Sequence, residues 1–179
     1  MRQQWYQLPK NQDLLRTEIA VMEPWVGKPV MGKNCGILPD GRFYWKVHVP
    51  IHKERRDGSV MFHTEYDLLL VYEANHPSVS YGSSIHCYPV GENGLARMRQ
   101  RVWEHGRTPS HLPHLVTDKD NRLYLCTWNT GAFGTELKDA KGVPTAAASL
   151  KRAIYYLTNL EAGLLNQAHW EKMHKEGAI

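Results

Sequence analysis

The stretch CGILPDGRFYWKVHV, residues 35–49, decides how the sheet of this protein begins. Pro39, Asp40 and Gly41 form a strong turn signal between two apolar runs, a pattern typical of a β-hairpin. The apolar side chains after the turn alternate with polar or charged ones: Phe43, Trp45, Val47 and Val49. Because neighbouring residues of a strand face opposite ways, this alternation predicts one face turned toward a core.

Two further strands are predicted downstream. Asp57-Gly58 marks another turn, and the segment TEYDLLLVYEA (64–74) is rich in residues that favour a sheet. The segment SSIHCYPV (83–90) reads as a fourth strand, ended by Pro89 and Gly91. The pattern so far is a meander of four antiparallel strands.

Helical spacing of apolar residues replaces this alternation elsewhere in the chain. A short helix is predicted over 10–22, an amphipathic one over 93–105, a long one over 144–165 that Thr145 can cap, and a final one over 166–175. Strands followed by helices favour an α+β fold: a four-stranded antiparallel meander with helices packed on one face.

Composition limits the class of protein. The chain has 179 residues, enough for one domain spanning 1–179. It lacks an apolar run long enough to span a bilayer and the apolar centre of a secretion signal, so no membrane partner and a cytoplasmic location are expected. A net charge of +4 is mildly basic, which makes nucleic acid an unlikely partner without clustered charge.

The segment around Cys126 offers the clearest candidate chemistry. Asp118 to Asn121 supply a turn, and Arg122 to Cys126 alternate, so the cysteine stands at the end of a short ribbon. One interpretation is a buried structural cysteine. A second is a zinc site with His105, His111 and His114. A third is a hydrolase in which His111 or His114 is the base for Cys126.

The order of these elements resembles the ubiquitin-conjugating enzyme family over about residues 32–165. FYWKVHV resembles its second strand, EYDLLLVYEANHPSV its third strand and proline turn, and SIHCYPV its fourth strand. LPHL (112–115) falls where the family has His-Pro-Asn-Ile, and LYLCTW falls where it has Ile-Cys-Leu. The residues around this core are then helical extensions at both ends and an insertion at about 91–110.

This resemblance implies a function. Cys126 would carry a ubiquitin-like modifier, or the C-terminus of a partner protein, as a thioester received from an adenylating (activating) enzyme. An amine of a target protein, such as a nucleotidyltransferase, would then attack the thioester. His114 stands in place of the family's asparagine, and Asn129 and Asp118 are further candidates for assisting the reaction. No cofactor and no metal are implied.

The departures from the family pattern are similar to those of bacterial relatives in anti-phage signalling (CBASS) or ubiquitin-like operons. Two other functions stay open. One is a non-catalytic binding module that retains the fold. The other is a basic accessory protein that binds nucleic acid through Arg97, Arg99, Arg101 and Arg107.

Overall fold

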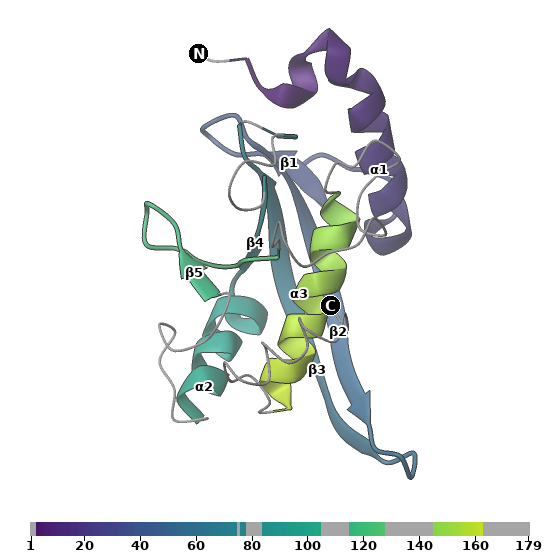
Figure 1. Cartoon of the computed structure of the whole chain (residues 1–179), viewed down its shortest axis with the longest axis vertical. Coiled ribbons are helices and arrows are strands. Elements are labelled where there is room, and N and C mark those ends of the chain that lie inside the picture. The colour runs from purple at the N-terminus through teal and green to yellow at the C-terminus, as the bar shows by residue number, and fades with distance from the viewer. Residues whose placement is uncertain (1–2, 75, 78–83, 105–114, 128–144, 163–179) are drawn as a thin grey trace, which may run out of the picture.

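A single antiparallel sheet organises the protein. In the computed structural model the described residues are 3–74, 76–77, 84–104, 115–127 and 145–162. Within these ranges the sheet has six strands in the order β1-β2-β3-β4-β6-β5. The strands are β1 (Cys35–Ile37), β2 (Phe43–Glu54), β3 (Val60–Tyr72), β4 (Ile85–Pro89), β5 (Leu115–Thr117) and β6 (Leu123–Leu125). Figure 1 shows β2 and β3 running side by side as the longest ribbon of the sheet.

The meander of β1 to β4 forms as predicted, but a four-stranded sheet was wrong. The segment before Cys126 folds into a hairpin, β5–β6, that adds two strands. It joins the edge of β4 through the pair Cys87 and Leu125. Strands of three residues carry too little alternation to reveal such pairing from sequence, since their position depends on contacts with a distant strand.

Three α-helices lie in the described ranges: α1 (Gln12–Val26), α2 (Arg97–Glu104) and α3 (Ala146–Glu161). Helix α1 contains Pro24 and runs four residues beyond the end of the helix predicted over 10–22. It ends at Gly27, which has a φ of 73° and donates its N–H to the carbonyl of Glu23 at 2.8 Å. A positive φ suits glycine at the end of a helix, so Gly27 rather than Pro24 sets the boundary.

The predicted helix over 93–105 begins as a π-helical turn, η3 (Glu92–Ala96), and continues as α2. Gly94 allows η3 to lie against the sheet, because a side chain there would collide with the main chain of Asp67 and Pro89. Met98 and Val102 are buried in the core, as their helical spacing predicted.

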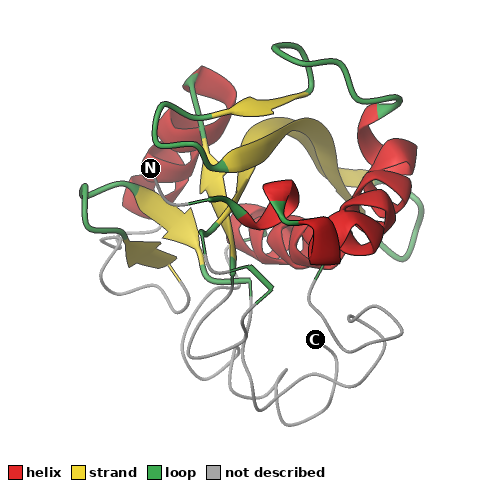
Figure 2. Cartoon of the chain, turned by 90° about the horizontal axis from the view of Figure 1, so that it is seen from above, coloured by secondary structure: helices red, strands yellow, loops and turns green. Residues whose placement is uncertain are grey.

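The core lies on the sheet face covered by α1 and α3 (Figure 1). The register places Trp45 beside Leu70 and Leu70 beside Cys87, so their side chains share this face. Figure 2 shows the strands curving past the helices. Thr145 caps α3, as predicted, and accepts a hydrogen bond from the nitrogen of Ala148 at 3.2 Å.

A polar cluster ties α2 and α3 to the sheet. Glu161 of α3 is buried and accepts a hydrogen bond from the hydroxyl of Tyr66 at 2.7 Å. Its other oxygen accepts from the guanidinium of Arg101 at 2.6 Å. Because the buried carboxylate is paired with both a cation and a hydroxyl donor, its desolvation is compensated. None of the helices in the described ranges is long and apolar enough to cross a membrane.

Candidate functional site

The three cysteines of the chain differ in their access to solvent. All are free thiols; Cys35 and Cys87 are buried, whereas Cys126 is partly exposed. Burial raises the pKa of both the Cys35 and Cys87 thiols, although a main-chain hydrogen bond from Val30 opposes the shift at Cys35. A thiol reacts as its thiolate, so Cys126 is the candidate nucleophile of this protein.

A tight turn fixes the hairpin that leads to Cys126. The carboxylate of Asp118 accepts hydrogen bonds from the main-chain nitrogens of Asp120 and Arg122, both at 2.9 Å. It also accepts one from the Arg122 guanidinium at 2.9 Å. Asn121 completes the turn with a φ of 57°, a conformation that asparagine tolerates better than most residues.

Several donors control the ionisation of Asp118. Burial favours its neutral form, but hydrogen bonds from Arg122, Asp120 and Tyr88 outweigh burial and lower the pKa of the carboxyl to about 2. Asp118 is therefore ionised at neutral pH and holds the turn together. Its predicted part in catalysis stays a prediction.

Side chains also fasten the hairpin to β4, which it meets through a single backbone pair. The hydroxyl of Tyr88 donates a hydrogen bond to Asp118 at 3.1 Å. The guanidinium of Arg122 lies over the Tyr88 ring, 5.3 Å from its centre. On β6, the ring of Tyr124 stacks on His86 of β4 with centres 4.2 Å apart.

This chain of contacts continues toward β3. Nδ1 of His86 lies 3.2 Å from a carboxylate oxygen of Glu73, and that oxygen accepts a hydrogen bond from Arg42 at 2.6 Å. Burial favours the neutral form of Glu73, yet His86 and Arg42 lower the pKa of its carboxyl. Paired charges and stacked rings thus hold the strand that carries Cys126 in one position.

A buried cation lies within electrostatic range of Cys126. Arg152 of α3 is only 7% exposed. Burial lowers the pKa of its guanidinium to about 9, and the electrostatic influence of Cys126 opposes that shift. Cys126 also acts on Tyr124, whose pKa is raised first by burial and then by this charge. A guanidinium within electrostatic range favours the thiolate form of a cysteine.

The structure places two of the four predicted site residues. Cys126 follows β6, and Asp118 lies in the turn before that strand, so the two residues stand at opposite ends of β6. His114 and Asn129 lie outside the described residues. So do His105 and His111, on which the zinc and hydrolase interpretations depend. Within the described ranges, no group of three His, Cys, Asp or Glu side chains could hold a metal ion.

The arginines proposed for nucleic-acid binding do not form one free row. Arg101 is bound to Glu161 and to Glu104, whereas Arg99 is exposed; Arg107 lies outside the described residues. Pairing with two carboxylates cancels the charge that Arg101 would offer to a phosphate backbone.

Sequence reasoning missed Arg152 as a neighbour of Cys126. Arg152 follows Lys151 in the helix predicted over 144–165. The spacing of residues alone does not tell which of two adjacent cations is buried. Lys151 is exposed and Arg152 is buried.

Comparison of this chain with family models, curated proteins and solved structures finds no match.

Proposed function

We propose that the protein is an acyl carrier of the ubiquitin-conjugating type, which holds a modifier on Cys126 as a thioester and passes it to an amine. One observation carries the proposal: Cys126 is the partly exposed cysteine of the three, at the end of a fixed hairpin. The resemblance of residues 32–165 to the ubiquitin-conjugating family supplies the reaction.

The reaction requires little beyond the sulfur. The Cys126 thiolate attacks the carbonyl carbon of a C-terminal acyl adenylate made by an activating enzyme. A carbon–sulfur bond forms and AMP leaves with the electron pair of the broken carbon–oxygen bond. An amine of the target then attacks the thioester, loses its proton to solvent or a nearby base, and releases the Cys126 thiolate.

Arg152 supports both steps in this proposal. Its positive charge favours the thiolate as the attacking group, and later favours the thiolate as the leaving group. The cation is buried, so water screens its effect on the sulfur less than it would at the surface. Such a cation stabilises charge without transferring a proton.

The second step leaves a role for a base or an oxyanion donor. Asp118 holds the turn with hydrogen bonds from its neighbours, and its pKa of about 2 makes it a weak base at neutral pH. His114 is the stronger candidate, because an imidazole titrates near neutral pH. In a CBASS operon the target amine would belong to a nucleotidyltransferase or another partner encoded nearby.

A loading assay tests the proposal. The protein is incubated with a candidate modifier, its activating enzyme and ATP, and is then run on gels with and without reductant. We expect a slower band that disappears on reduction and is absent from Cys126→Ala. Cys126→Ser should give a band that resists reductant, because an oxygen ester replaces the thioester. Cys35→Ala is the matched control and should load normally.

The same assay separates the alternatives. A non-catalytic binding module would bind the modifier yet give no reducible band with any activating enzyme tested. His114→Ala should load normally but discharge to an amine more slowly, and normal discharge would remove His114 from the mechanism.

A further inference from the structure

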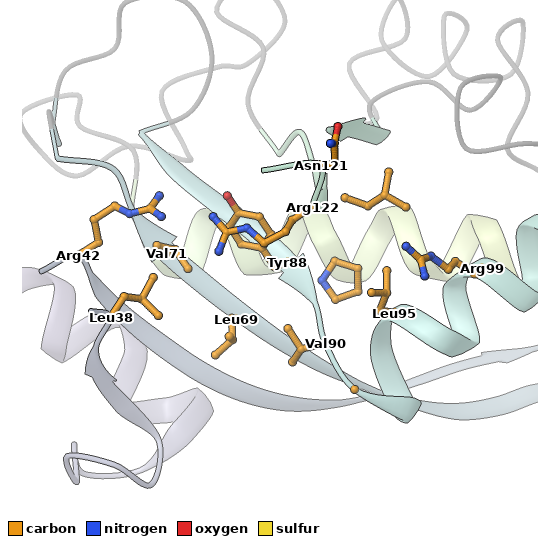
Figure 3. A pocket seen from close by; sticks show the side chains of 13 residues that line it. Leu38, Arg42, Leu69, Val71, Tyr88, Val90, Leu95, Arg99, Asn121 and Arg122 are labelled. Carbon is orange, nitrogen blue, oxygen red and sulfur yellow. The ribbon is translucent and has the colours of Figure 1, made fainter. Parts of the chain in front are cut away.

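A pocket of about 280 Å³ opens on the sheet face that α1 and α3 leave uncovered (Figure 3). It lies where four parts of the fold meet: the β1–β2 turn, the strands β3 and β4, the turn η3 with the start of α2, and the β5–β6 hairpin. Gly91, just before η3, and Leu95 within it form one wall.

The floor of the pocket is apolar. Its aliphatic side chains come from distant parts of the sequence: Leu38, Leu69, Val71, Val90, Leu95 and Leu123. An apolar, concave floor favours an apolar ligand, because the ligand then removes apolar surface from water. The volume lies at the small end of the range for ligand pockets, which favours a compact ligand over a nucleotide.

The charged side chains around this floor are all basic. None of the described residues that line the pocket is acidic. Figure 3 shows Arg42 at one end, Arg122 beside Tyr88 in the middle and Arg99 at the other end. The pocket therefore offers an apolar floor for the carbon skeleton of a ligand and basic side chains at its rim.

The three arginines differ in what they can still bind. Arg42 is occupied by Asp40 and Glu73. Arg122 uses Nε and one terminal nitrogen on Asp118 and Asp120, while its Nη1 makes no hydrogen bond with any described residue.

Arg99 is exposed and forms no ion pair within the described ranges. One whole guanidinium, that of Arg99, thus remains for a ligand at this end of the pocket. A single guanidinium matches one negative charge better than the two charges of a phosphate monoester.

We infer that this pocket binds a small monocarboxylate with an apolar body, its acid group at Arg99 and its body on the aliphatic floor. A planar carboxylate accepts two parallel hydrogen bonds from one guanidinium, which fixes the ligand at the rim. The inference is independent of the acyl-carrier proposal, because neither Cys126 nor Arg152 lines the pocket.

Calorimetric titration of the full chain with octanoate tests the inference, with octanamide and acetate as matched probes. Octanamide keeps the body without the charge, and acetate keeps the charge without the body. We expect octanoate to bind at least about tenfold more tightly than either, since a hydrogen bond to a charged group and the apolar contact each contribute on this scale. Equal binding of octanoate and octanamide, or no binding of octanoate, overturns the inference.

Two arginine variants locate the site. Arg99→Gln should weaken octanoate binding about tenfold and leave octanamide unchanged. Arg56→Gln removes the same charge from the exposed β2–β3 turn and should change neither. An equal loss in both variants means that net charge drives binding and overturns the inference. Unchanged octanoate affinity in Arg99→Gln overturns it as well.

Titration with a peptide distinguishes a protein partner from a small acid. An acetylated hexapeptide that ends in leucine carries the same carboxylate and an apolar side chain. If the peptide binds through Arg99 and octanoate does not, the occupant is a protein C-terminus and the inference is wrong. Amide shifts at Val90, Gly91 and Leu95 on addition of octanoate, seen by nuclear magnetic resonance, are expected if it is correct.

Discussion

The carboxylate of Glu18 in α1 accepts a hydrogen bond from the main-chain nitrogen of Ala146, the first residue of α3, at 3.0 Å. The same oxygen accepts a hydrogen bond from the hydroxyl of Tyr72 in β3 at 2.6 Å, and Tyr72 in turn accepts one from the indole of Trp45 at 2.9 Å. A negative charge is favourable at a helix N-terminus. One buried carboxylate thus joins α1, β3 and α3.

Replacing Glu18 should therefore destabilise the whole core. We expect Glu18→Ala to lower the free energy of unfolding by about 3 kcal/mol. The substitution leaves the buried donors of Ala146 and Tyr72 without an acceptor. Urea denaturation followed by circular dichroism measures this. Glu23→Ala is the control: it changes an exposed glutamate of the same helix and should cost less than about 0.5 kcal/mol. Equal effects of the two substitutions would contradict the role given to Glu18.

His76 makes stability depend on pH in the acid range. It is buried between Trp5 and Tyr72 with its Nε2 4.0 Å from a carboxylate oxygen of Glu18, and burial prevails over this contact and lowers its pKa from 6.5 to about 3. Between these values the unfolded chain binds a proton that the folded chain does not, so stability falls as the pH falls from about 6.5 toward 3. The slope for this one group is about 1.4 kcal/mol per pH unit.

The contribution of His76 is isolated by a variant. Between pH 7 and pH 5 the wild-type protein should lose about 2 kcal/mol more than His76→Asn, measured by urea unfolding at both pH values. His52→Asn changes an exposed histidine of the β2–β3 ribbon and should keep the wild-type dependence. The pH effect has another source if all three proteins respond alike.

The cysteines should differ in their reaction with an alkylating agent. We expect iodoacetamide to modify Cys126 in the folded protein and to reach Cys35 and Cys87 only after unfolding, because the last two are buried. Mass spectrometry of digests taken over time identifies the modified residue. Rapid labelling of Cys87 in the native protein would show that the β4–β6 edge opens.

Arg152 should make Cys126 more reactive. Arg152→Met removes the cation while keeping an unbranched side chain in the buried position, so we expect alkylation of Cys126 at neutral pH to slow by roughly threefold to tenfold. Lys151→Met is the matched control, since Lys151 is the exposed neighbour on α3. Circular dichroism melts confirm that both variants fold. An unchanged rate in folded Arg152→Met removes Arg152 from the site.

Asp118 should contribute to stability through the β5–β6 turn. Asp118→Asn replaces one acceptor oxygen with an amide group that faces the donors of Arg122 and Tyr88, so we expect a loss of about 1 to 2 kcal/mol at pH 7. Its pKa is lowered from 3.8 to about 2, so this stabilisation is present above pH 3.8 and is lost as the pH falls toward 2.

Urea unfolding of wild type and variant at pH 7 and pH 3 checks this prediction. The two proteins should differ less at the lower pH. If Asp118→Asn instead slows thioester discharge without any change in stability, the residue acts in the reaction and not in the turn.

Local sequence was enough for the elements whose signals lie within a few residues. The Pro39-Asp40-Gly41 turn and the alternation after it define β1 and β2, and Thr145 marks the start of α3. The local sequence also placed Cys126 at the end of a short β-ribbon. The helix predicted over 10–22 stops four residues too early, because Gly27 rather than Pro24 ends α1.

The sequence by itself determined the turns, the alternation of the long strands and the helical spacing, because these depend on the conformational preferences of neighbouring residues. Only the tertiary structure decided that β5–β6 joins β4, that Arg152 rather than Lys151 is buried near Cys126, and that three arginines surround one pocket. Each depends on contacts between residues far apart in the chain. Such contacts are selected by burial and charge pairing in the assembled core, which no local pattern records.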